Sequence, residues 1–165
     1  MKMYFIYFIC FVIVQRLLEL IVAKRNEKWL RKQGALEYGQ KHYPFIVLLH
    51  ILFIVTMIIE YYFKRGEFNK IFMILFLILI LSKIWIIYSL GKYWNTKILR
   101  IPHSSFVKKG PYKIFKHPNY FIVICEIVVI PFVFNLYITA ITFTVLNAIM
   151  LMIRIKQEER VWAII

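Results

Sequence analysis

The sequence contains no aspartate, and all eight of its acidic residues are glutamate. Charged residues make up 18% of the 165 residues, whereas about 25% is usual in soluble domains. The hydrophobic share is 62%, well above the usual value of about 45–50%. This composition excludes an ordinary soluble domain, and its apolar content excludes an intrinsically disordered chain.

Cysteine is scarce too, with two residues in the whole chain. Cys10 and Cys125 each lie inside an apolar run, so they predict small buried hydrophobic residues and neither a disulfide framework nor a metal site. The net charge of +14 first suggests a nucleic-acid partner. However, the basic residues gather between apolar runs, as the positive-inside rule describes for membrane proteins. We therefore expect a lipid bilayer as the partner and no nucleic acid.

Long apolar runs dominate what is present. A helix needs about 20 residues to cross a bilayer, and the runs at 3–23, 43–63 and 71–90 have that length. A longer run is interrupted by Pro131 and Asn135, which divides it into a short segment, 120–134, and a second segment, 136–153. The sequence predicts an all-α, polytopic integral membrane bundle of about five transmembrane helices, with the last two forming a hairpin. One domain covers 1–165.

The linkers between these runs predict the orientation of the chain. Sixteen of the 22 basic residues lie in 24–42, in 91–117 or in the tail from 154 onward. These three regions alternate with linkers poor in basic residues, so they fall on the same side of the membrane. The positive-inside rule then places the N-terminus outside and the C-terminus in the cytoplasm.

Ionisable residues inside the predicted spans are functional candidates by default. Arg16 and Glu19 share a helical face and favour a structural ion pair. Lys83 is expected to snorkel towards an interface. Glu126 needs a partner, either from the first or the fifth segment or from a cofactor, so Arg16 and Glu126 remain candidates for substrate binding. His50 is interpreted as a hydrogen-bonded core residue outside the site.

The most informative stretch runs from 110 to 120. Gly110 and the proline after it break regular structure, and Pro118 keeps His117 extended before starting a helix. A plain turn would not need Tyr112, His117 and Tyr120 gathered around it. We therefore expect this stretch to lie across the mouth of the fourth segment.

The C-terminal tail carries a second cluster of charges. If the fifth helix continues, Arg154 and Glu158 are four residues apart and share a helical face. An exposed ion pair of this kind contributes only a few tenths of a kcal/mol. The group nevertheless lies where a cytoplasmic pocket would open at the membrane face.

At these two places the chain resembles the isoprenylcysteine carboxyl methyltransferase family of integral-membrane, S-adenosylmethionine-dependent enzymes, and in particular its small bacterial members. The family pattern is a Gly and an aromatic residue, then Arg-His-Pro-x-Tyr, two membrane passes, and an Arg followed by paired Glu. It corresponds here to Gly110-Pro111-Tyr112, Lys116-His117-Pro118-Asn119-Tyr120, Arg154 and Glu158-Glu159.

Three residues depart from that pattern. Lys116 replaces the Arg before His-Pro, which keeps the charge but loses the bidentate fork. Ile122 stands where many members have Gly. His103 lies one residue away from the His that many members carry before the Gly.

The resemblance implies an O-methyltransferase in the bacterial plasma membrane with S-adenosyl-L-methionine as its cofactor, bound within about 91–165. It places Gly110, Tyr112, His117, Pro118 and Tyr120 around the cofactor, with Glu158 or Glu159 on its amino group or ribose. It also implies that Arg154 orients the acceptor oxygen or binds the cofactor carboxylate.

The implied acceptor is a lipophilic small molecule or a lipidated group that partitions into the membrane. It carries either an isoprenylcysteine-type carboxylate or an acidic hydroxyl of an alkylpyrone-type lipid. Two other functions stay open from the sequence. One is a membrane lipid or sterol-type reductase with a nicotinamide cofactor, and the other is a non-enzymatic membrane scaffold.

Overall fold

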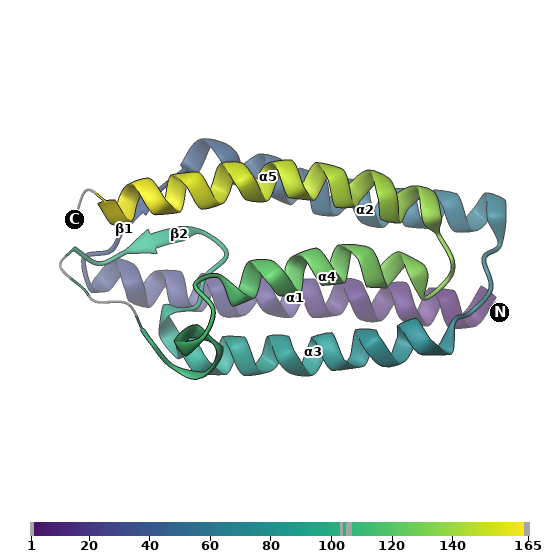
Figure 1. Cartoon of the computed structure of the whole chain (residues 1–165), viewed down its shortest axis with the longest axis horizontal. Coiled ribbons are helices and arrows are strands. Elements are labelled where there is room, and N and C mark those ends of the chain that lie inside the picture. Colours follow the sequence, from purple (N-terminus) through teal and green to yellow (C-terminus); the bar gives the residue numbers. More distant parts are fainter. Residues whose placement is uncertain (1, 103, 105–106, 164–165) are drawn as a thin grey trace.

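Five helices form the protein in the computed structural model, which describes residues 2–102, 104 and 107–163, without the side chains of 162 and 163. They are α1 (Lys2–Lys32), α2 (Tyr43–Lys64), α3 (Lys70–Leu90), α4 (Pro118–Phe132) and α5 (Tyr137–Ala163). Figure 1 shows them side by side along the long axis of the molecule. The fold is an all-α helical membrane bundle, as the sequence predicts.

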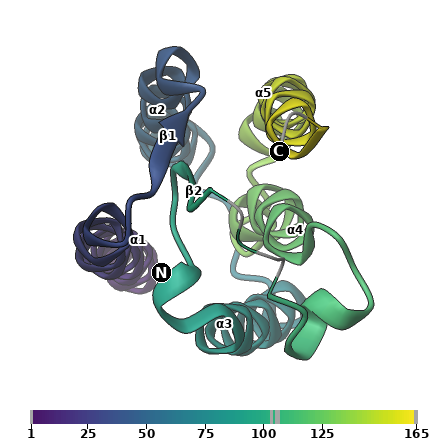
Figure 2. The ribbon, with the colours of Figure 1, turned by 90° about the vertical axis from the view of Figure 1, so that its left-hand side faces the viewer.

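Four of the helices, α1, α2, α3 and α5, are long and apolar enough to cross a membrane. The 15 residues of α4 span only about 22 Å at 1.5 Å per residue, less than the roughly 30 Å of hydrocarbon. This helix packs between α3 and α5, as the end view shows (Figure 2). The predicted hairpin of the last two segments is therefore present, with one short arm.

Both α1 and α5 extend beyond their predicted apolar segments. Helix α1 continues to Lys32 and α5 to Ala163. The extensions carry charged residues and project at the end of the bundle that holds the C-terminus (Figure 1). The continued α5 places Arg154 and the paired glutamates on one unbroken helix, which is the condition that the tail motif requires.

The opposite end of the bundle is fixed by polar contacts between its two loops. Asn69 caps α3 by accepting hydrogen bonds from Ile71 N and Phe72 N, at 3.1 and 3.4 Å. Glu60 of α2 accepts from the backbone N–H groups of Ile138 and Thr139, at 3.1 and 2.7 Å. A carboxylate there satisfies the free N–H groups at the start of α5 and complements its dipole.

An aromatic core lies near the same end. Phe5 of α1 stacks on Tyr61 of α2, with ring centroids 3.7 Å apart, and Phe134 meets both rings edge-on. Phe8 and Phe76 extend the cluster to α3. Close packing at this end joins α1, α2, α3 and the segment that carries Phe134. The loops and cavities described below lie toward the opposite end.

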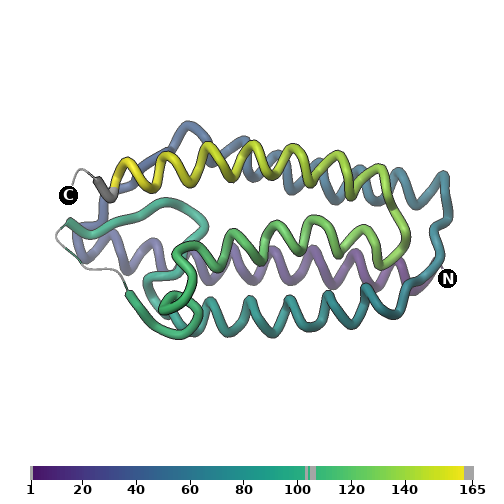
Figure 3. The backbone as a smooth tube through the Cα atoms, in the orientation of Figure 1, coloured from purple at the N-terminus to yellow at the C-terminus, as the bar shows by residue number. Residues whose placement is uncertain are grey.

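The base-rich end carries a small sheet that the sequence pattern does not predict. Strand β1 (Leu36–Tyr38) pairs antiparallel with β2 (Ile98–Arg100). Three short 3-10 helices, Gln40–His42, Gly91–Tyr93 and Gly110–Lys113, complete the connections. Three-residue strands are too short to show a periodicity. Figure 3 traces the segment between α3 and α4 as it folds back over this end of the bundle.

Candidate functional site

A first cavity, of about 170 Å³, opens at the base-rich end. The segment between α3 and α4 supplies most of its lining. The start of α4 and the ends of α1, α3 and α5 supply the rest. Among the lining residues are Tyr112, His117, Tyr120, Arg154 and Glu158. The two motifs of the sequence, separated by one membrane hairpin, therefore meet around one cavity.

A second cavity, of about 310 Å³, lies inside the bundle and is mainly apolar. Side chains from all five helices line it, including Ile13, Leu17, Ile51, Val123 and Met150. Leu17 is 53% exposed and Ile51 is 54% exposed. Because these lining residues of α1 and α2 also face outward, the cavity is accessible to hydrocarbon from the side of the bundle.

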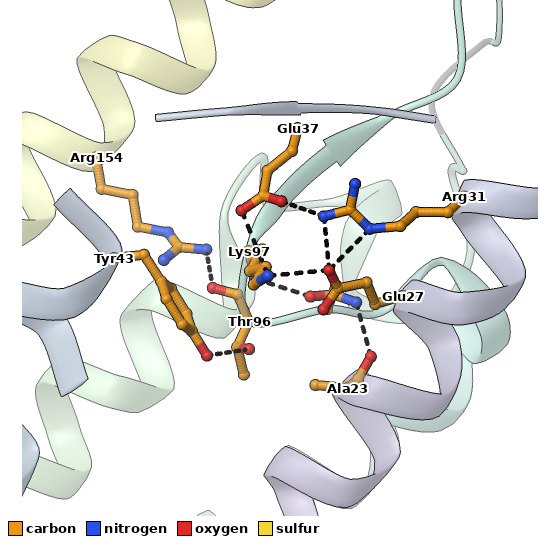
Figure 4. Close-up of polar contacts among 9 residues, drawn as sticks. Ala23, Glu27, Arg31, Glu37, Tyr43, Thr96, Lys97 and Arg154 are labelled. Carbon is orange, nitrogen blue, oxygen red and sulfur yellow. Dashed lines mark hydrogen bonds and ion pairs between the residues drawn. The ribbon is translucent and has the colours of Figure 1, made fainter. Parts of the chain in front are cut away.

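The two cavities share a wall made by Trp94, Asn119, Tyr120 and Arg154. Arg154 Nε donates to the Tyr120 hydroxyl at 2.9 Å, and Nη2 donates to the carbonyl oxygen of Thr96 at 2.5 Å (Figure 4). The Tyr120 hydroxyl donates in turn to Glu158. This chain of hydrogen bonds fixes a guanidinium between the first cavity and the second, which is the more apolar of the two.

His117 lies against the same wall. Its ring stacks on Tyr120, with centroids 5.3 Å apart, and its Nδ1 is 3.8 Å from Glu158 Oε2. His117 Nε2 is buried and has no hydrogen-bond partner in the described part of the chain. A buried polar atom without a partner beside a cavity is typical of a group that hydrogen-bonds a ligand.

The structure separates the two adjacent glutamates. Glu158 faces the first cavity, whereas Glu159 forms an exposed ion pair with Lys116 at 2.7 Å. Lys116 is the residue that replaces the expected Arg. The ammonium group of lysine is a single point charge and is sufficient to pair with Glu159. This contact therefore does not need the bidentate fork of an arginine.

Gly110 and Pro118 shape the segment without lining either cavity. Gly110 has φ +51, and a Cβ there would lie 2.2 Å from Ser89 Oγ of α3. Only glycine tolerates both conditions. Pro118 is buried at the first position of α4. Tyr112 lines the first cavity, and burial raises the pKa of its phenol well above the ordinary value, which keeps it neutral.

A charged cluster fastens the wall to α1. Lys97 Nζ donates to Glu27 Oε1 at 2.9 Å, and Arg31 contacts both Glu27 and Glu37 (Figure 4). The hydrogen bond to Glu27 raises the pKa of Lys97 above its ordinary value. Asn95 Nδ2 also donates to the carbonyl oxygen of Ala23. The segment before β2 is therefore held to the extension of α1, which positions Thr96 for Arg154.

Four ionisable residues of the membrane spans form one neutral network. Arg16 pairs with Glu19 at 3.0 Å and with Glu126 at 2.9 Å. Lys83 pairs with Glu126 at 2.8 Å and with Glu19 at 3.2 Å. The predicted Arg16–Glu19 pair is confirmed, and Glu126 finds its partner on α1. The prediction that Lys83 snorkels is wrong, because Lys83 is buried at 2% exposure and compensated by two carboxylates.

Of this network, Arg16, Glu19 and Lys83 line the second cavity, while Glu126 is fully buried behind them. Sequence reasoning missed several other lining residues, among them Trp94, Thr96 and Asn119, and it left His50 outside the site although His50 lines the second cavity. Of these residues, Asn119 lies within the motif quoted above and could have been identified from the sequence. His103 lies outside the described residues.

These features define a class: a helical membrane protein in which a cavity at one end of the bundle meets a more apolar cavity inside it. Residues 72–164 match the isoprenylcysteine carboxyl methyltransferase (ICMT) family. The chain belongs to this family, and its function is accordingly that of a membrane methyltransferase.

Two relatives are similar over nearly their whole length. The uncharacterized protein YpbQ of Bacillus subtilis is 43% identical over 155 residues, with 92% of each chain covered. An uncharacterized protein of Haemophilus influenzae is 30% identical over 156 residues, covering 92% of this chain and 90% of that one. No solved structure matches the chain.

Proposed function

We propose that the protein is an S-adenosylmethionine-dependent O-methyltransferase whose acceptor is a lipophilic molecule with an anionic oxygen. The observation that carries this proposal is the shared wall. A cavity lined by charged and polar side chains as well as apolar ones meets a more apolar cavity at Arg154 and Tyr120. Such an arrangement suits a reaction between one water-soluble and one membrane-partitioned reactant.

The first cavity fits S-adenosylmethionine by the chemistry of its residues. The Glu158 carboxylate suits the amino group or ribose of the cofactor, and the free Nε2 of His117 offers one further hydrogen bond. When bound, S-adenosylmethionine supplies an activated methyl group. Together with Tyr112 and Tyr120, these residues make up the cofactor part of the single domain, within about 91–165.

Arg154 is the residue that would act on the acceptor. A carboxylate or ionised hydroxyl already carries the negative charge that methyl transfer needs, so alignment and the exclusion of water contribute most. Tyr120 and Thr96 fix the guanidinium from two directions, which prepares it to orient an anionic oxygen. The apolar lining of the second cavity would keep water away from that oxygen.

The distribution of charge supports a cytoplasmic position for this wall. The base-rich linkers and the C-terminus lie together at the end that carries the first cavity (Figure 1). Under the positive-inside rule this end faces the cytoplasm of a bacterial cell and the N-terminus faces outward. The cofactor would then bind from the cytoplasm and the acceptor from the bilayer. Isoprenylcysteine-type carboxylates and acidic hydroxyls of alkylpyrone-type lipids both have the required chemistry.

The test is equilibrium binding of labelled S-adenosylmethionine to the purified protein in nanodiscs. Glu158→Gln should weaken binding by about tenfold or more, because it removes a charge-assisted contact. Glu159→Gln changes the neighbouring residue in the same way and should bind normally, and Glu67→Gln, at the opposite end, is a second comparison. A folded wild type that binds no S-adenosylmethionine would refute the proposal, and binding of a nicotinamide cofactor in its place would favour a reductase.

A further inference from the structure

The second cavity contains a polar side chain that the proposed function does not use. Asn147 of α5 is 3% exposed and lines this cavity. Its side-chain amide makes no hydrogen bond to any residue that the structure describes. An apolar chain that filled the cavity would leave this amide unpaired, which costs about 1–3 kcal/mol, so a bound group that pairs with the amide is favoured.

His50 of α2 faces the same cavity. Its Nδ1 lies 2.8 Å from the carbonyl oxygen of Ile46. A carbonyl oxygen can only accept, so Nδ1 carries the hydrogen and Nε2 is left as an acceptor. Within the described chain, Nε2 has no partner of its own. The cavity therefore presents one hydrogen-bond acceptor on α2, which is His50 Nε2. On α5 the amide of Asn147 presents both donor and acceptor groups.

The packing of α2 against α5 places these two side chains at one depth. The helices run antiparallel, and Phe53 meets Phe143 edge-on at 5.4 Å, one turn further from the base-rich end. Two turns nearer that end, Tyr43 and Arg154 both hydrogen-bond Thr96. His50 lies seven residues from Tyr43, and Asn147 lies seven residues from Arg154, so the two polar side chains lie at the same depth in the cavity.

Asn147 and His50 form a second polar level in the cavity, and the same spacing gives its distance from Arg154. Asn147 and Arg154 are seven residues apart on one helix, which corresponds to about 10 Å along its axis. The cations nearest to this level, Arg16 and Lys83, are already paired with Glu19 and Glu126. Because the network is neutral, it offers no free charge to a ligand. The group bound here should therefore be uncharged.

We propose that Asn147 and His50 form a second binding site for the methyl acceptor, which receives a hydroxyl group about 10 Å along the chain from the oxygen held at Arg154. A hydroxyl is the smallest group that can accept from the Asn147 amide while donating to His50 Nε2. The inference rests on the proposed function for the position of the acceptor oxygen. It narrows the acceptor to a lipid acid that carries a hydroxyl in the middle of its chain.

The experiment compares two labelled probes, octadecanoate and 10-hydroxyoctadecanoate, binding to the purified protein in detergent. Asn147→Leu should weaken binding of the hydroxylated probe by about tenfold, the usual value of one buried hydrogen bond, and leave binding of octadecanoate unchanged. Thr144→Val removes a hydroxyl from the same helix outside the cavity and should alter neither probe. For each probe, the affinity of the variant is divided by that of the wild type. Any difference between the two probes in their partition into detergent then cancels.

Stability provides an independent measurement. Since the amide of Asn147 has no partner, Asn147→Leu should unfold at the same midpoint as the wild type or at a higher one. A marked loss of stability would assign Asn147 a structural role and overturn the proposal. Equal effects on the two probes, or no binding of either probe to the wild type, would also overturn it. Binding of S-adenosylmethionine, measured in parallel, reports separately on the proposed function.

Discussion

Neutralising Glu126 should be among the most destabilising single changes in the membrane spans. Its carboxylate is fully buried and accepts hydrogen bonds from Arg16 at 2.9 Å, Lys83 at 2.8 Å and Gln15 at 3.3 Å. The network contains two cations and two carboxylates. Glu126→Gln leaves it with one excess positive charge in the membrane interior. Breaking a buried pair in this way costs about 3–5 kcal/mol.

A second substitution shows whether charge balance is the cause. Lys83→Met preserves most of the side-chain volume and removes the excess cation, leaving Arg16 with Glu19 at 3.0 Å. We expect the double variant to recover at least half of the loss, about 2 kcal/mol. Lys83→Met alone completes the double-mutant cycle. Glu67→Gln, an exposed site, should change the free energy of unfolding by at most about 0.5 kcal/mol.

The assay is reversible unfolding in mixed micelles by titration with sodium dodecyl sulfate, followed by circular dichroism. Two results would refute the reasoning. One is a penalty for Glu126→Gln below about 1 kcal/mol, which is the range of exposed ion pairs. The other is additive losses in the double variant, which would show that Glu126 and Lys83 contribute independently.

Two further predictions concern the outer loop and the shared wall. Gly66→Ala should lower the free energy of unfolding by about 1–3 kcal/mol, the usual cost of overpacking. The reason is that a Cβ at this position would lie 1.8 Å from the carbonyl oxygen of Phe134. An unchanged unfolding curve would contradict this close approach. Arg154→Lys keeps the charge but cannot hydrogen-bond both Tyr120 and Thr96, so kcat for methyl transfer should fall by about 100-fold. The exposed Arg160→Lys should have normal kinetics, and a normal kcat in Arg154→Lys would refute the proposed role.

Much of the fold follows from the linear pattern of the chain. Apolar runs of the right length, separated by basic linkers, predicted where each helix starts within a few residues, because each span must satisfy its own backbone in lipid. The predicted first segment ended at 23, whereas α1 continues to Lys32. Hydropathy reports where a helix leaves the membrane, and helix propensity and capping decide where it stops.

The candidate site was predictable only in part. His117, Tyr120, Arg154 and Glu158 stood out as polar residues in motifs, and they line one cavity. The division between Glu158 and Glu159 was not readable, because adjacent residues on a helix point about 100° apart and only packing decides which one faces inward. In the structure Glu158 lines the first cavity, and Glu159 forms an exposed ion pair with Lys116.

The sequence by itself determined that this chain is a membrane bundle with its basic residues at one end and two motifs at that end. Composition and hydropathy act through local free energies of transfer, so they can be read along the chain. The tertiary structure alone decided which buried charges compensate one another, since Lys83 meets Glu126 across 43 positions. It also decided that two cavities share Arg154 and Tyr120. Such contacts depend on how the helices pack, and no local pattern in the chain encodes them.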